Sequence, residues 1–97
     1  MSITLLILNA PPELEEDLVD YLLSLPVVEG FTSYQVNGHG ENSNLSVAEQ
    51  VSGRRRRIQY ELLTGENAVA EILAGIAANV GRDIVYWQQA VFNSGRI

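Results

Sequence analysis

The chain has 97 residues, 46% of them hydrophobic, and a formal charge of -6 from 12 acidic and 6 basic residues. This length leaves room for one hydrophobic core, so we expect a single domain over residues 1–97. The absence of cysteine excludes disulfides, thiolate metal sites and cysteine nucleophiles. The negative net charge argues against a nucleic-acid partner.

The first third of the chain predicts a strand, a helix and a second strand. Residues 3–8 are almost all Ile or Leu, which indicates a central strand covered on both faces. After the Pro11-Pro12 pair, acidic residues suit the positive end of a helix. Apolar residues at helical spacing follow over 14–25, and Pro26 ends that helix. Segment 31–37 is rich in residues that favour β-structure and predicts the second strand.

A long connection follows, over residues 38–53. Its first part, 38–44, is Gly- and Asn-rich and predicts a loop. Ser46 and Glu49 then form a capping box that can start a short helix through Gln50, and Gly53 can stop it.

The rest of the chain predicts a strand over 54–63, a helix over 69–80 and a last strand over 83–91. In the first of these, Ile58, Tyr60 and Leu62 alternate with Arg57, Gln59 and Glu61. The element order is βαββαβ. Two right-handed crossovers in this order give a ferredoxin-like α+β two-layer sandwich, with an antiparallel four-stranded sheet and both helices on one face.

The sheet face opposite the helices should remain apolar. Ile3, Leu5 and Ile7 point away from Leu6 and Leu8, and helices can cover only one of the two sets. We therefore expect part of the open face to meet another subunit in a homo-oligomer. The N-terminus has no signal-peptide pattern and its apolar run is too short to span a bilayer, so we expect a cytoplasmic protein without direct membrane insertion.

Two features are candidate sites, and each has a simpler structural interpretation. His39, the single histidine, lies between glycines near Glu41 and can ligate a divalent metal if symmetry gathers several copies; a polar loop residue is the simpler interpretation. Arg54, Arg55, Arg56 and Arg57 can bind a small anion, with Arg55 and Arg57 on the open face and the other two on the helix side. Solvation and salt bridges between subunits are the simpler interpretation.

Catalysis is not expected. The Gly38-His39-Gly40 stretch lacks the spacing of a phosphate-binding loop, and the chain has no lysine. The sequence has no Gly-x-Ser-x-Gly nucleophile elbow that could pair a serine with the single histidine. We therefore predict a protein that is not an enzyme.

Several stretches together carry a family resemblance: 10–16 (APPELEE), 30–33 (GFTS) leading to 38–40 (GHG), 46–56 (SVAEQVSGRRR) and 94–97 (SGRI). They resemble an uncharacterised family similar to the nitrogen regulatory protein P-II, whose members are often encoded beside heavy-metal efflux pumps. The resemblance implies a homotrimer with a regulatory role. It also implies that the loop over 38–53 contacts a partner, such as a membrane transporter or efflux system.

Residue type and resemblance together give one set of candidate residues for a ligand or partner. It consists of His39, Glu41, Glu49, Gln50, Arg54, Arg55, Arg56 and Arg57. A small anionic ligand is one expectation. The alternative is a divalent-metal-binding or metal-tolerance protein, in which His39 and carboxylates such as Glu41 or Glu49 ligate a metal across subunits.

Overall fold

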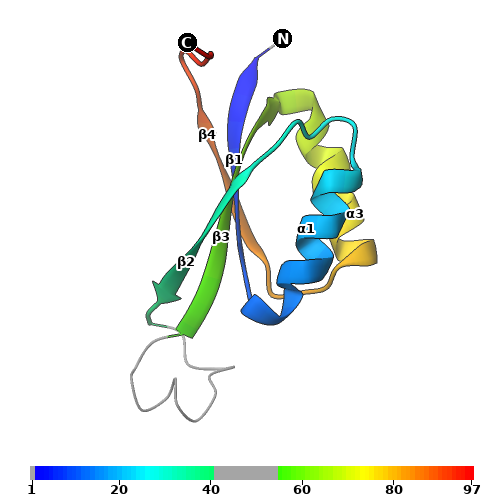
Figure 1. Ribbon diagram of the computed structural model, residues 1–97, viewed down its shortest axis with the longest axis vertical. Helices are drawn as coiled ribbons and strands as arrows, with labels where there is room; N and C mark the ends of the chain where they lie inside the picture. The colour runs from blue at the N-terminus through cyan, green and yellow to red at the C-terminus, as the bar shows by residue number, and fades with distance from the viewer. Residues whose placement is uncertain (1, 41–54) are drawn as a thin grey trace.

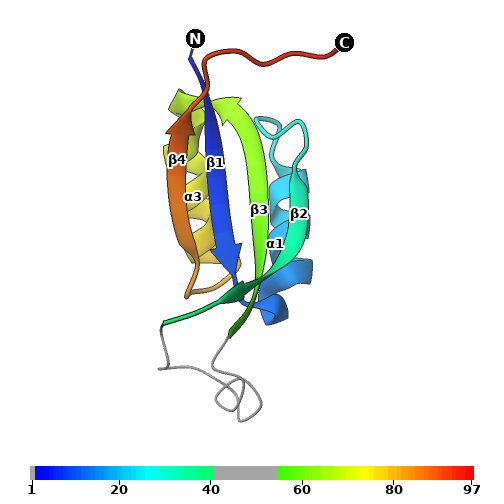
Figure 2. The same ribbon diagram turned by 90° about the vertical axis from the view of Figure 1, so that its left-hand side faces the viewer.

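The computed structural model describes residues 2–40 and 55–97. The elements of this part, with two short 3-10 helices (η), are β1 (Ile3–Ala10), η1 (Pro12–Leu14), α1 (Glu15–Ser24), β2 (Thr32–Gly38), β3 (Arg55–Gly65), η2 (Glu66–Ala68), α3 (Val69–Asn79) and β4 (Val85–Ala90). The four strands form one antiparallel sheet in the order β2-β3-β1-β4, and both helices lie on one face of it (Figures 1 and 2). The predicted ferredoxin-like α+β sandwich is confirmed.

Strand β1 is central because its sequence supplies apolar side chains to both faces. It pairs with β3 on one side and with β4 on the other, and Leu6 lies opposite Leu62 and Gln88 in these two ladders. Leu6 and Leu8 point toward the helices and are fully buried. Ile7 points toward the open face and is only 3% exposed, whereas Ile3 on the same face is 40% exposed, so no layer of the described chain covers the open face along the whole strand.

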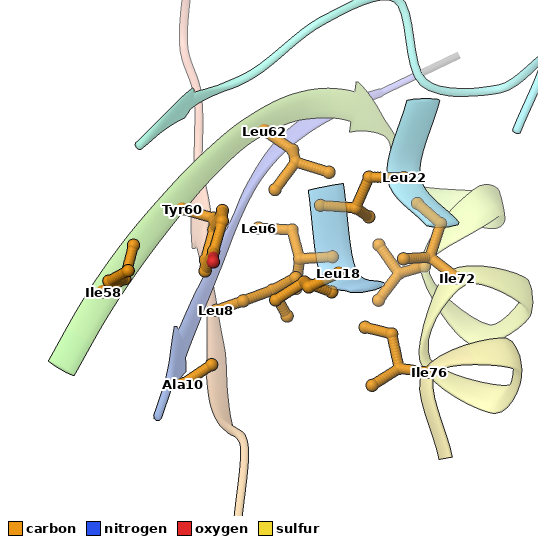
Figure 3. Packing of buried hydrophobic residues seen from close by; sticks show 11 residues of the cluster. Leu6, Leu8, Ala10, Leu18, Leu22, Ile58, Tyr60, Leu62, Ile72 and Ile76 are labelled. Atoms are coloured by element: carbon orange, nitrogen blue, oxygen red, sulfur yellow. The ribbon is translucent and has the colours of Figure 1, made fainter. Parts of the chain in front are cut away.

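The core lies between the sheet and the two helices (Figure 3). Leu18 and Leu22 of α1 and Ile72 of α3 are fully buried there. The helical spacing of these apolar residues is what lets each helix bury one stripe and leave the rest in water. The strands contribute the alternate residues that face the helices, namely Leu6, Leu8, Ala10, Ile58, Tyr60 and Leu62.

The two helices approach closely at Gly75 of α3. A Cβ atom at this position would overlap the hydroxyl oxygen of Tyr21. That hydroxyl donates a hydrogen bond to the backbone carbonyl of Ile72 at 3.0 Å. A glycine is therefore needed for Tyr21 of α1 to reach the backbone of α3.

The last strand begins later than predicted. We expected it from Asp83, but β4 begins at Val85. Asp83 has φ of 65°, in the left-handed region, which is incompatible with an extended strand. The short helix predicted from Ser46 through Gln50 lies outside the described residues.

The open face exposes large apolar side chains from β3 and β4. Leu63, Val85 and Trp87 are 51%, 52% and 38% exposed. All six residues of β4 are exposed. Within residues 2–40 and 55–97, no helix combines the length and apolar character needed to cross a membrane.

Candidate functional site

The candidate site lies at the end of the sheet where β1 ends and β3 begins. Arg57 is 4% exposed there, although it belongs to a run of four arginines. Its Nε donates to Oδ1 of Asn9 at 2.6 Å, and its Nη2 donates to the backbone carbonyl of Asn9 at 2.7 Å. Burying a guanidinium is unfavourable unless an opposite charge and hydrogen-bond acceptors replace the water around it. Asn9 supplies two of these acceptors.

Asp83 supplies the opposite charge. Arg57 Nη1 donates to Oδ2 of Asp83 at 3.2 Å, and Nη2 donates to the backbone carbonyl of Asp83 at 2.8 Å. Arg55 forms a second ion pair with the same carboxylate oxygen. Two guanidinium groups thus share one carboxylate, which gives these three residues a formal charge of about +1 on a protein whose total is -6.

A line of hydrogen bonds continues from Asn9 across the open face. Asn9 Nδ2 donates to Oε1 of Gln59 at 3.1 Å, and Gln59 Nε2 donates to the hydroxyl of Tyr34 at 3.0 Å. Tyr34 in turn donates to Oε2 of Glu61 at 2.7 Å. This last bond raises the pKa of Tyr34, because ionisation would remove the shared proton and place a phenolate beside a carboxylate.

His39 lies beside the arginine cluster. It lines a cavity of about 110 Å³ together with Asn9, Gly38, Arg55, Arg57 and Val85. The imidazole is exposed, whereas Arg57 is buried. Guanidinium, imidazole and amide donors around so small a space suit a carboxylate or another small oxyanion.

The arginine run divides between the two faces of the sheet, as its period predicts. Arg55 and Arg57 share the open face with Asn9. Arg56 lies opposite Asn37 in the β2–β3 ladder and lines a separate cleft on the helix side. Arg56 therefore cannot join Arg55 in holding one ligand within a single chain.

The other predicted site residues give no metal centre in the part of the chain that the structure describes. Glu41, Glu49, Gln50 and Arg54 lie outside the described residues. Among residues 2–40 and 55–97, no group of three or more His, Cys, Asp or Glu side chains gathers closely enough to hold a metal ion.

Sequence reasoning missed the two residues that organise the cluster, Asn9 and Asp83. Asn9 had a signal, since it is a polar residue that ends a run of Ile and Leu and shares the period of the open face. Asp83 had none, because its role depends on a left-handed turn that brings it back to β3.

Comparison with known proteins agrees with the fold. The crystal structure of a DUF3240 family protein from Shewanella baltica OS155, at 2.40 Å resolution, is similar with a TM-score of 0.82 and 21% sequence identity. The similarity covers 100% of this chain and 98% of that one. No curated protein matches the sequence. The profile of the family described as "Protein of unknown function (DUF3240)" matches residues 1–97, so the chain belongs to the DUF3240 family.

Proposed function

We propose that this protein is a non-catalytic, PII-like regulatory protein that acts as a homotrimer. In this proposal the connection over residues 38–53 contacts a transporter or metal-efflux system, and a small anion bound beside Arg55 controls that contact. The observation that carries the proposal is the charged Arg57–Asp83 cluster at the foot of this connection, next to an uncovered apolar sheet face.

Exposed apolar surface supports assembly through the open face. Leu63, Val85 and Trp87 lie on adjacent strands and remain between 38% and 52% exposed. A monomer gains nothing from keeping such side chains in water, whereas a symmetric oligomer buries them. The polar line from Asn9 to Glu61 crosses the same face and would fix how the copies align.

The size and charge of the cavity beside His39 support a small anionic ligand. Its volume of about 110 Å³ is below the several hundred Å³ that drug-sized ligands occupy. The cavity suits one carboxylate or oxyanion group, because the guanidinium groups of Arg55 and Arg57 line it together with the imidazole of His39.

The lining of the cavity supports a role in binding rather than catalysis. The cavity is formed by Asn9, Gly38, His39, Arg55, Arg57 and Val85, and none of these carries a hydroxyl or thiol nucleophile. Among the described residues that line the cavity, His39 therefore has no neighbouring nucleophile of the kind that acyl transfer uses.

The alternative is a divalent-metal protein that uses His39 with Glu41 or Glu49 of neighbouring copies. The exposure of His39 supports it, because an exposed imidazole is accessible to other subunits. Two guanidinium groups line the same cavity, however, and they repel a cation. The cluster therefore favours the anion.

The assembly is tested by multi-angle light scattering on the full chain at micromolar concentration. We expect the mass of three copies for the natural chain and the mass of one copy for Leu63→Glu with Trp87→Glu, because two carboxylates would be buried at the contact. Ala70→Glu, on the exposed side of α3, is the matched control and should keep the trimer. A monomeric natural chain would contradict the proposal.

The role of the connection is tested by affinity capture from detergent-solubilised membranes of the producing cell. The natural chain is compared with a variant in which residues 41–53 are replaced by a short Gly-Ser linker. We expect membrane proteins that are enriched by the natural chain to be lost with the variant. Equal enrichment by both chains would remove the connection from the proposal.

A further inference from the structure

The segment that follows β4, residues 91–97, lies away from the body of the molecule. Figure 2 shows it leaving the top of β4 and crossing the end of the sheet to a point beyond the strands. Phe92 and Ile97 are fully exposed, and a Cβ atom at Gly95 would have no atom within 4 Å beyond its two chain neighbours. Within the described residues, no hydrogen bond or ion pair joins residues 92–97 to the sheet or the helices. In a single copy this segment buries neither of its large apolar side chains.

An exposed apolar patch lies at the same end of the open face. Thr4 lies opposite Ala90, the last residue of β4, so the segment begins beside the start of β1. Ile3 and Leu63 lie there on the open face, on adjacent strands, and are 40% and 51% exposed. The connection between β2 and β3 leaves the sheet at the opposite end (Figure 1). The patch and the segment therefore both keep apolar surface in water at one end of the molecule.

Charge complementarity favours a second copy of this chain as the partner of the segment. Residues 91–97 contain one base, Arg96, and no acid. Removing this charge of +1 from the total of -6 leaves -7 on residues 1–90. Acids also border the patch, because Glu61 lies two residues before Leu63 on the same face of β3, and Glu66 follows that strand directly. A second copy thus offers the segment both apolar surface and opposite charge.

We propose that the segment 91–97 of one copy packs on the open face of a neighbouring copy. Phe92 contacts Ile3 and Leu63 of the neighbour, and apolar side chains of both copies leave water together. Each copy lends its segment to one neighbour and receives the segment of another, so that three copies close a ring. The inference rests on the proposed homotrimer and deepens it, because it names the segment that joins the copies.

The first test removes the apolar side chains of the segment and measures assembly by light scattering over a dilution series. Phe92→Ser with Ile97→Ser should raise at least tenfold the concentration at which half of the chains are assembled. Leu23→Ser is the control, because Leu23 is 63% exposed on α1, on the other side of the sheet. It should assemble as the natural chain does.

This test separates the inference from the proposed function. A natural trimer that the double variant leaves unchanged overturns the role of the segment and leaves the homotrimer standing. A monomeric natural chain overturns the homotrimer, and the inference falls with it.

The second test identifies which copies are in contact. The chain has no cysteine, so one cysteine can be introduced into each of two separately produced chains, and a tag on one chain gives the mixed pair its own mass. Oxidation of Phe92→Cys mixed with Leu63→Cys should join the two chains on a non-reducing denaturing gel, because a disulfide requires close approach of both residues. Phe92→Cys mixed with Leu23→Cys should give at least tenfold less of the mixed pair.

Two outcomes of the second test contradict the inference. Equal amounts of mixed pair from the two mixtures would show that the segment has no preferred contact with the open face. A disulfide formed only within one chain, when that chain carries both Phe92→Cys and Leu63→Cys, would show that the segment folds back on its own sheet.

Discussion

Arg57 contacts Asp83 at two points: its Nη1 lies 3.2 Å from the carboxylate Oδ2, and its Nη2 donates to the backbone carbonyl at 2.8 Å. The pair joins the start of β3 to the turn before β4. Because Asp83 has φ of 65°, the contact also holds its backbone in a conformation that few side chains tolerate.

Removing the charge of Asp83 should destabilise the fold. Asp83→Asn keeps a residue that tolerates the left-handed conformation but leaves the buried Arg57 without its full counter-charge. We expect a loss of about 1–3 kcal/mol in the free energy of unfolding, measured with urea. Glu29→Gln, at an exposed position, is the charge-matched control and should change stability by less than about 0.5 kcal/mol. An Asp83→Asn variant as stable as the control would show that the Arg57–Asp83 pair contributes nothing to the free energy of unfolding.

Adding a methyl group at the helix crossing should also destabilise the protein. In Gly75→Ala, the new Cβ would overlap the hydroxyl of Tyr21, so the helices must separate or Tyr21 must leave Ile72. We expect a loss of about 1–3 kcal/mol in thermal or urea unfolding, although alanine favours helix more than glycine does. Gly30→Ala, where no atom lies within 4 Å of the new Cβ, should be nearly neutral.

Tyr60 should make stability depend on alkaline pH. Burial, and then the charge of Glu15, raise its pKa from 10.0 to about 12. The folded state therefore holds this proton more tightly than the unfolded state. The resulting stability is fully present below pH 10 and is lost as the pH rises toward 12.

The control for this pH dependence is Tyr60→Phe. The hydroxyl of Tyr60 is buried and has no hydrogen-bond partner in the described chain, so its removal should raise stability by roughly 1 kcal/mol at neutral pH. Urea midpoints of the variant should fall less than those of the natural chain between pH 10 and pH 12. Parallel curves for the two proteins would contradict the assignment.

His39 separates the anion proposal from the metal alternative. Calorimetry with copper, zinc and cobalt ions should give the same result for the natural chain and for His39→Ala. The reason is that guanidinium groups line the same cavity and repel cations. Acetate or inorganic phosphate should instead shift the imidazole NMR resonances of the natural chain. Metal binding that disappears in His39→Ala would favour the alternative.

The sequence was sufficient for the fold because each element buries a clear apolar pattern. The alternation of Ile58, Tyr60 and Leu62 defines the buried face of β3. The spacing of Leu18 and Leu22 defines the buried face of α1. The site was less predictable, since Arg57 and Asp83 meet only through a turn whose left-handed residue no local pattern indicates. Runs of charged residues are usually solvated. Only the tertiary structure therefore reveals that one arginine of such a run is buried.

The strand order has a practical consequence for studying this molecule. The first and last described residues lie at one end of the sheet, whereas β2 ends and β3 begins at the other end (Figure 1). Attaching the protein to a sensor surface through residue 97 would leave the arginine cluster facing the solution. Immobilised protein can therefore be probed with anions or membrane extracts in the same orientation.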